Sequence, residues 1–231
     1  MKSVLITGAS AGIGLHTAQS FADADYQVIN LSRRPCPLER VTHIGCDLAE
    51  PGFIDNIGDQ LATLLRDAEE IVLIHNAAKL ANDSAMDTED QAFRQVLEIN
   101  LVAPNTLNRF VLPFMQPGSS ILYVGSTLSE KAVPGSFSYV TTKHAMIGMM
   151  RATCQDLAGK GVHTACVCPG FTDTEMLREH IPADVMEQIA GMSAYARLVT
   201  PDEIASALFW AARSPVINGA VIHANLGQVE R

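Results

Sequence analysis

Two polar side chains in the middle of the chain have a spacing suited to acid–base chemistry. Tyr139 and Lys143 are four residues apart in SYVTTKHAMIGMM, a stretch whose pattern predicts a helix. Side chains at this spacing lie on one face of a helix. A phenol is a poor acid or base at neutral pH, and a nearby ammonium favours its anion. The pair can therefore share the transfer of a proton.

A glycine-rich loop near the start of the chain predicts an anion site. In VLITGASAGIG, an apolar run precedes Gly8, Gly12 and Gly14, and helical spacing of apolar residues follows. The run predicts a buried strand, and the glycines let the backbone turn sharply and approach a bulky group. The N-terminus of the following helix offers unpaired N–H groups and a positive dipole, which suits phosphate. The spacing differs from GxGxxG, so the loop alone is equally consistent with a tight turn.

Short apolar runs alternate with helical patterns along the chain. They predict strands at 4–7, 28–31, 41–46, 71–75, 121–125, 162–168 and 220–223. This alternation predicts an α/β fold, a doubly wound parallel sheet of about seven strands with helices on both faces, in three layers. Ligands bind beyond the carboxyl ends of such strands. The residues expected along that edge, besides the glycine loop, are Ser32, Arg33, Arg34, Asp47, Asn76, Ala77, Ala78, Ser126, Pro169 and Gly170.

Three local patterns refine the expected elements. Apolar spacing predicts one helix over 53–65 and a longer helix over 93–111. Thr200, Pro201 and Glu203 predict a capping box at the start of a late helix. Residues 32–40 are too few for a crossover helix, so we expect a turn there.

Composition limits the class of protein. With 231 residues and 48% apolar content, the chain is expected to form a single domain over 1–231. A formal charge of −9 argues against nucleic acid as a partner. The five cysteines, which lack CxxC spacing, indicate a reduced cytoplasm, and no apolar run predicts a signal peptide or membrane span. No metal is expected, because His75, His144 and His163 lack partners at metal-ligand spacing.

The order and spacing of the motifs resemble a short-chain dehydrogenase/reductase over nearly the whole chain. The motifs are TGASAGIG, Asp47, Asn76-Ala77-Ala78, Asn100, Ser126, Tyr139 with Lys143, and Pro169-Gly170 followed by Thr174. The resemblance implies a Rossmann-like fold and hydride transfer between a nicotinamide dinucleotide and a carbonyl or alcohol. It also implies a homodimer or homotetramer.

The resemblance implies four catalytic residues. Tyr139 would protonate the carbonyl oxygen during reduction, while Ser126 forms a hydrogen bond with that oxygen. Lys143 would bind the nicotinamide ribose and favour the anion of Tyr139. Asn100 would hold a water that continues the proton relay to solvent.

The resemblance also implies that the glycine loop cradles the pyrophosphate and adjoining ribose. Besides Tyr139 and Lys143, the implied cofactor contacts are Gly8, Ser10, Gly12, Ile13, Gly14, Asp47, Leu48, Asn76, Ala77, Pro169, Gly170, Thr172 and Thr174. Ser32 and Arg33 stand where NAD enzymes carry an acidic residue. A small hydroxyl leaves room for a 2′-phosphate and a guanidinium can bind it, so NADP(H) is favoured over NAD(H). Ala78 stands where the family usually has glycine, so a backbone conformation that requires glycine is not expected at this position.

The sequence indicates the class of substrate less clearly than it indicates the cofactor. Residues of about 175–196 correspond to the family's mobile substrate-covering segment, and their apolar side chains suit a hydrophobic ketone or aldehyde. The stretches PGFTDTEM and ARLVTPDEIA resemble 3-oxoacyl-carrier-protein reductases, but a basic dock for an acidic carrier is missing. A dinucleotide-sensing protein without turnover is the alternative of another class. The presence of all four catalytic residues argues against it.

Overall fold

The computed structural model describes residues 1–228 and is built on one sheet of seven parallel strands. The strands are β1 (Lys2–Thr7), β2 (Gln27–Ser32), β3 (Val41–Gly45), β4 (Glu70–His75), β5 (Ser120–Val124), β6 (His163–Pro169) and β7 (Ala220–Ala224). Their order in the sheet is β3-β2-β1-β4-β5-β6-β7, so the chain crosses over after β3. The predicted α/β fold is confirmed.

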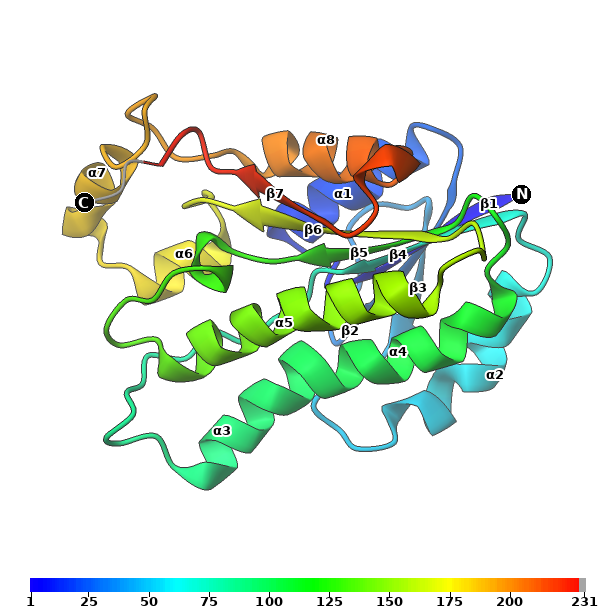
Figure 1. The fold of residues 1–231 in the computed structure, drawn as a ribbon, viewed down its shortest axis with the longest axis horizontal. Coiled ribbons are helices and arrows are strands. Elements are labelled where there is room, and N and C mark those ends of the chain that lie inside the picture. Colours follow the sequence, from blue (N-terminus) through cyan, green and yellow to red (C-terminus); the bar gives the residue numbers. More distant parts are fainter. Residues whose placement is uncertain (229–231) are drawn as a thin grey trace.

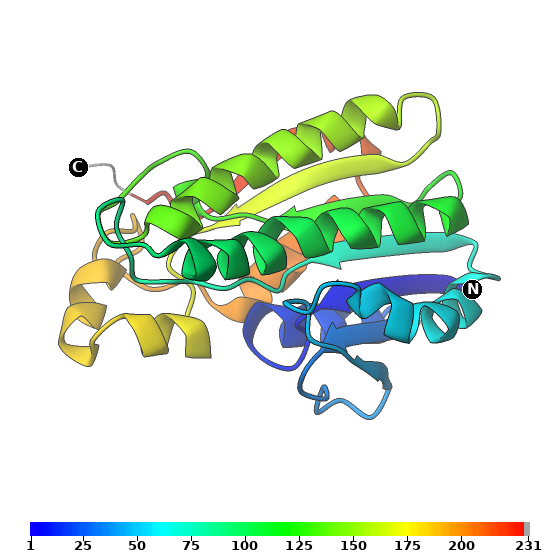
Figure 2. The ribbon, with the colours of Figure 1, turned by 90° about the horizontal axis from the view of Figure 1, so that it is seen from below.

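Helices cover both faces of the sheet (Figure 1). On one face lie α1 (Gly12–Ala22) and α8 (Pro201–Ala211), which pack against each other. On the other lie α2 (Phe53–Leu65), α4 (Ala103–Val111) and α5 (Phe137–Asp156), the layer nearest the viewer in Figure 2. Successive residues of β1 point to opposite cores, with Val4 and Ile6 in one and Leu5 in the other. Both layers are thus held by apolar burial.

The predicted long helix over 93–111 is interrupted at its middle. It begins as α3 (Asp90–Leu97), widens into the π-helical turn η1 (Glu98–Val102), and continues as α4. Asn100 lies in η1 and is fully buried. Single π turns inside α-helices are often found at functional sites. Apolar periodicity does not report such a turn, because the apolar face continues through it.

The shorter elements lie between these helices and strands. They are η2 (Leu112–Phe114), η3 (Thr127–Ser129), α6 (Glu175–His180), η4 (Ala183–Val185), α7 (Met186–Ala190) and η5 (Pro215–Ile217). Residues 33–40 contain no helix, as the predicted turn requires. Within residues 1–228, every helix is too short or too polar to cross a membrane.

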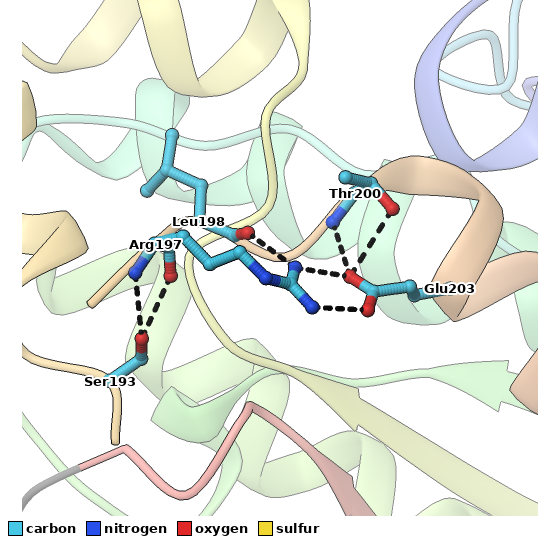
Figure 3. A network of polar contacts seen from close by, with 5 residues as sticks. All are labelled: Ser193, Arg197, Leu198, Thr200 and Glu203. Atoms are coloured by element: carbon cyan, nitrogen blue, oxygen red, sulfur yellow. Dashed lines mark hydrogen bonds and ion pairs between the residues drawn. The ribbon is translucent and has the colours of Figure 1, made fainter. Parts of the chain in front are cut away.

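The predicted capping box at α8 is present (Figure 3). The main-chain N–H of Thr200 donates to Glu203 Oε2 at 2.9 Å. Arg197 adds two parallel bonds to the same carboxylate, at 2.8 and 2.7 Å. The Ser193 hydroxyl in turn donates to the carbonyl oxygen of Arg197 at 2.8 Å. The chain entering α8 from segment 175–196 is thereby fixed to the helix start.

Candidate active site

The carboxyl ends of the parallel strands meet at one edge of the sheet. In Figure 1 the arrowheads of β5, β6 and β7 point to this edge, and α6 and α7 lie beside it. The glycine loop follows β1, and Ser126 comes just after β5. The sequence-predicted residues therefore come from separate parts of the chain to a common edge.

The glycine loop favours glycine at two positions, for different reasons. Gly8 has a φ of +75°, which favours glycine. A Cβ built on Gly14 would lie 2.2 Å from the carbonyl oxygen of Gly8. The residue before α1, Ala11, provides no side-chain cap, and the first turn of α1 holds no acidic residue. The first N–H groups and the positive dipole of α1 are therefore available to an anion.

Thr7 and Asn76 join the glycine loop to the loop after β4. The Thr7 hydroxyl accepts from the main-chain N–H groups of Asn76 and Ala77, each at 3.0 Å. The Asn76 amide donates to the carbonyl oxygens of Thr7 and Gly8, at 2.9 and 3.1 Å. Thr7 was not among the predicted site residues. The sequence feature that could have identified Thr7 is its place as a polar residue directly before Gly8, at the end of an apolar strand.

Ala78 needs no glycine conformation. Among residues 1–228, the non-glycine residues with positive φ are Asp25, Ala196 and Leu226. The backbone at Ala78 is therefore accessible to any residue. The alanine at this position is therefore compatible with the loop after β4.

The turn after β2 is organised by Asn30, which is fully buried. Its side-chain oxygen accepts from the N–H of Ala9 at 2.9 Å, and its amide nitrogen donates to the Ser32 hydroxyl at 2.9 Å. The Ser32 hydroxyl donates to the carbonyl oxygen of Arg34 at 2.6 Å. Arg33 is exposed and, within residues 1–228, has no side-chain partner. Asn30 therefore fixes the loop that presents Arg33.

Arg34 has a partner on the substrate side of the site. Its guanidinium lies 3.1 Å from a carboxylate oxygen of Glu175, and both side chains are mostly exposed. Glu175 is the first residue of α6. A Cβ built on Gly12 would lie 3.2 Å from Thr174 Cγ2, so the start of α6 also lies over the glycine loop. The segment after β6 thus contacts the expected cofactor cradle at two points.

The remaining predicted cofactor residues lie in turns at the same edge. Asp47 forms a turn in which its side chain accepts from the N–H of Ala49 at 2.9 Å. Leu48 is buried in the core, and Ser10 and Ile13 are half-buried in the glycine loop. Past Pro169, the last residue of β6, the N–H of Gly170 donates to Ala224. The Thr172 hydroxyl donates to the carbonyl oxygen of Gly170, and the Thr174 hydroxyl accepts from Leu177, capping α6.

Tyr139 and Lys143 lie on the first turns of α5, with the Lys143 ammonium 5.4 Å from the centroid of the Tyr139 ring. Lys143 is only 2% exposed, and its ammonium donates to the carbonyl oxygen of Val124 at 2.7 Å. In residues 1–228 no carboxylate pairs with this ammonium. An ammonium carries three donors, so two remain for other groups.

Ser126 lies at the start of η3, which packs against α5. Its hydroxyl oxygen accepts from the N–H of Leu128 at 3.1 Å, and its N–H donates to the Ser129 hydroxyl at 3.0 Å. Over the described part of the chain, the Ser126 hydroxyl hydrogen has no acceptor. It is therefore free to donate to a substrate oxygen.

Two cysteines lie under this turn. Cys166 and Cys168 are fully buried with their sulfur atoms 3.8 Å apart, as expected of small side chains on one face of a strand. The hydrogen bond with Cys168 and burial together raise the pKa of the Cys166 thiol. A Cβ on Gly125 would lie 2.7 Å from the Cys168 sulfur. Sulfur thus fills the space directly behind Ser126.

The Asn100 side chain joins α5 to the loop after β4. Its oxygen accepts from the N–H of Lys79 at 2.8 Å, and its nitrogen donates to the carbonyl oxygen of Lys79 at 3.1 Å. The same nitrogen donates to the Thr142 hydroxyl at 2.9 Å. Both amide hydrogens are therefore used within the protein. Asn100 can therefore bind a further hydrogen-bond partner only through an oxygen atom, as an acceptor.

The three histidines considered above as metal ligands, His75, His144 and His163, lie apart in different environments. His75 ends β4, is buried, and pairs through Nε2 with the Asn108 side-chain oxygen at 2.8 Å. His163 is also buried, with Nε2 2.9 Å from the carbonyl oxygen of Ala211. His144 is exposed on α5. Across residues 1–228, no group of three metal-ligating side chains comes together.

Comparison with known proteins assigns the family. Residues 8–228 match the family model described as enoyl-(acyl carrier protein) reductase. The chain belongs to the short-chain dehydrogenase/reductase family. As a member, it is an NAD(P)-dependent oxidoreductase that acts on a carbonyl or alcohol group.

This short-chain dehydrogenase/reductase is similar to curated and solved proteins along its whole length. It is 29% identical over 244 residues to Protein FixR of Bradyrhizobium diazoefficiens, covering 98% of this chain and 86% of FixR. It is 28% identical over 243 residues to 3-oxoacyl-(acyl-carrier-protein) reductase FabG of Thermotoga maritima, covering 99% and 98%. The crystal structure of a short chain dehydrogenase family protein from Francisella tularensis has a TM-score of 0.90 at 26% identity, covering 98% of each chain.

Proposed function

We propose that the protein is an NADP(H)-dependent reductase of hydrophobic carbonyl compounds, with Tyr139 as the proton donor. The observation that carries this proposal is the buried Lys143 ammonium, which has a single carbonyl partner and lies beside the Tyr139 ring. Leaving a buried ammonium without further partners is costly. Ribose hydroxyls and a phenolate oxygen are suitable partners for its two remaining donors.

The residues present fit a nicotinamide dinucleotide. The uncapped start of α1 offers N–H groups to a pyrophosphate, and Gly14 has no space for a side chain there. When bound, the nicotinamide supplies the hydride to the carbonyl carbon. We assign the contacts with the two riboses, adenine and carboxamide to the residues that the family resemblance implies.

The proton steps belong to side chains of this chain. Ser126 donates its hydroxyl hydrogen to the carbonyl oxygen and holds it near Tyr139. Tyr139 gives its proton to that oxygen as negative charge develops. Lys143 stabilises the resulting phenolate. Because both Asn100 amide hydrogens are used elsewhere, we propose that the relay water donates to an oxygen atom of Asn100, in the side chain or the main chain.

A tyrosine variant tests the reaction. Tyr139→Phe keeps the ring but removes the transferable proton, so turnover should fall about 100-fold or more while NADPH binding persists. Turnover is followed as loss of NADPH absorbance with a panel of aldehydes, ketones, quinones and 3-oxoacyl thioesters. Tyr26→Phe is the control for loss of a phenol hydroxyl, because the Tyr26 hydroxyl donates to Glu70 at 2.7 Å, away from the site. Unchanged turnover in Tyr139→Phe contradicts the proposal, and NADPH binding without any reduction favours a dinucleotide sensor.

The preference for NADP(H) rests on Ser32 and Arg33. No carboxylate ends β2, and the Arg33 guanidinium is exposed and unpaired in the described chain. Arg33→Asp removes a charge-assisted pair with the 2′-phosphate and adds repulsion, which should weaken NADPH binding by about 2 kcal/mol or more. Titration of the wild type with both reduced dinucleotides checks the assignment. Equal affinities, or a higher affinity for NADH, overturn it.

We also propose that residues 1–231 form a single domain, in which a segment of about 175–196 covers a hydrophobic substrate. Met176 and Leu177 of α6 bring apolar side chains to the edge where the strands end. The likeness to FabG proteins supports 3-oxoacyl thioesters as an alternative substrate class. A marked preference for the thioesters in the panel would select that class.

A homodimer or homotetramer is proposed as the working form. Val102 and Phe137 lie two residues from Asn100 and Tyr139 respectively, and they are 43% and 40% exposed. The family resemblance places the helices that bear Asn100 and Tyr139 between subunits, and the exposed apolar side chains suit burial there. Light scattering at micromolar concentration that gives only the monomer mass would contradict this proposal.

A further inference from the structure

Asp83, in the loop after β4, is bonded to the first turn of α5. The N–H of Ser138 donates to Asp83 Oδ1 at 3.0 Å, and the Ser138 hydroxyl donates to Asp83 Oδ2. The N–H of Phe137 donates to the main-chain oxygen of Asp83 at 3.2 Å, and the N–H of Asp83 donates to the carbonyl oxygen of Gly135 at 3.1 Å. Three hydrogen bonds therefore join Asp83 to the first two residues of α5, and a fourth joins it to Gly135, just before the helix.

These bonds replace a local helix cap. The first N–H groups of a helix need acceptors outside the helix, which the residue before the helix often supplies. Ser136 holds that position in α5 and provides no side-chain bond. Asp83, 55 residues away from Ser138, supplies the acceptor instead, and its carboxylate also suits the positive end of the helix dipole. The start of α5 is therefore placed by a distant part of the chain.

The other end of the same loop is held by Asn100. Asn100 binds the N–H and carbonyl oxygen of Lys79, and also the Thr142 hydroxyl on α5. The Thr142 hydroxyl donates to the carbonyl oxygen of Tyr139 at 2.9 Å. The loop 79–83 thus connects Asn100 with the helix residues on either side of Tyr139.

We propose that Asp83 is a positioning residue of the active site, which holds Tyr139 at its working distance from Ser126 by fixing the first turn of α5. The proposal rests on the proposed role of Tyr139 as proton donor. A misplacement of about 1 Å can cost about 100-fold in rate, so a small shift of this turn affects turnover before it affects folding. Ser138, the neighbour of Tyr139, is fully buried and transmits the position directly.

The test compares Asp83→Ala with Asp87→Ala. Asp87 lies further along the connection between β4 and α3, and its carboxylate accepts from the N–H and hydroxyl of Ser84, at 2.8 and 2.7 Å, rather than from α5. Both variants lose one carboxylate and the two hydrogen bonds that it accepts from a serine N–H and hydroxyl. We expect kcat at saturating NADPH to fall about 10-fold or more in Asp83→Ala and to stay within about twofold of wild type in Asp87→Ala. Affinity for NADPH, measured by titration, should change little in either variant.

Two readouts separate positioning from general structural damage. The solvent deuterium isotope effect on kcat should rise in Asp83→Ala, because proton transfer becomes slower than the other steps. Asp83→Asn keeps an acceptor for the Ser138 N–H and should restore most of kcat. The proposal is overturned if Asp83→Ala and Asp87→Ala have the same kcat. It is also overturned if the loss in Asp83→Ala follows the folded fraction with an unchanged isotope effect.

Further measurements keep the proposal testable if a variant or the reaction fails. If Asp83→Ala does not fold, Ser138→Ala removes only the side-chain bond to Asp83 Oδ2 and should still lower kcat by about threefold or more, whereas wild-type kcat overturns the proposal. If the wild type reduces no carbonyl, the proposed function fails by itself. Amide hydrogen exchange over residues 137–140 then decides: faster exchange in a folded Asp83 variant than in Asp87→Ala supports the cap, and equal rates overturn it.

Discussion

Stability should depend on pH through His75, the buried last residue of β4. Its ring lies 4.9 Å from the Tyr123 ring, and its Nε2 is 2.8 Å from the Asn108 side-chain oxygen. The Asn108 nitrogen donates to the Tyr123 hydroxyl, so the Asn108 oxygen must accept the hydrogen of Nε2. In the described chain, Nδ1 is buried without a partner. A proton added to Nδ1 would therefore have no acceptor.

The magnitude follows from the pKa of His75. Burial lowers this pKa from 6.5 to about 4, because the charged imidazolium is poorly solvated in the core. The unfolded chain therefore binds a proton at a higher pH than the folded chain. The stabilising contribution is complete above pH 6.5 and is lost as the pH falls to about 4. A difference of about 2.5 pH units corresponds to an upper value of about 3 kcal/mol in the free energy of unfolding.

The substitution His75→Asn removes the titrating group and keeps a donor for the Asn108 oxygen. Urea unfolding at several pH values, followed by circular dichroism, gives the free energy of unfolding of each protein. Between pH 7 and pH 4, the wild type should lose up to about 3 kcal/mol more than His75→Asn. His16→Asn, at an exposed position of α1, controls for the loss of a histidine as such. Parallel curves for the wild type and His75→Asn would refute the reasoning.

Two other substitutions test the cofactor cradle. Gly14→Ala places a Cβ 2.2 Å from the Gly8 oxygen, so it should lower the free energy of unfolding by about 1–3 kcal/mol. It should also weaken the binding of NADPH. The control is Gly148→Ala, where no atom lies within 4 Å of the new Cβ. Its thermal unfolding temperature should equal or exceed that of the wild type, and its affinity for NADPH should be unchanged. Glu175→Gln frees Arg34 from an exposed ion pair worth at most about 1 kcal/mol, so NADPH should bind up to about fivefold more tightly. The freed Arg34, which follows Arg33 in the chain, is expected to become a second cationic partner of the 2′-phosphate, so calorimetric titration should show no such change for NADH. An equal gain for both dinucleotides would contradict this prediction.

The sequence was sufficient for features that depend on local spacing. Gly8 and Gly14 indicate a close approach of the backbone in the loop after β1. Tyr139 and Lys143 lie on one face of α5 because they are four residues apart in a helix. The parallel sheet then brings the strand ends together whatever the loops contain. These are consequences of periodicity and of strand direction.

Contacts between distant segments could not be predicted in the same way. Thr7, Asn30 and Asp83 each stabilise a loop that is remote in the sequence, and no spacing rule links them to their partners. The π turn at Asn100 is equally hidden, because one extra residue within a turn leaves the apolar face nearly unchanged. Side-chain hydrogen bonds across the fold decide these features.

The cap that Asp83 places on α5 has a consequence for the order of folding. A contact between residues 55 positions apart requires closure of a long loop, whereas the later turns of α5 form from neighbouring residues. Helical signal should therefore return before activity during refolding from urea. We therefore expect Tyr139, the proposed proton donor, to reach its final position only after β4 has docked in the sheet and Asp83 has reached the start of α5.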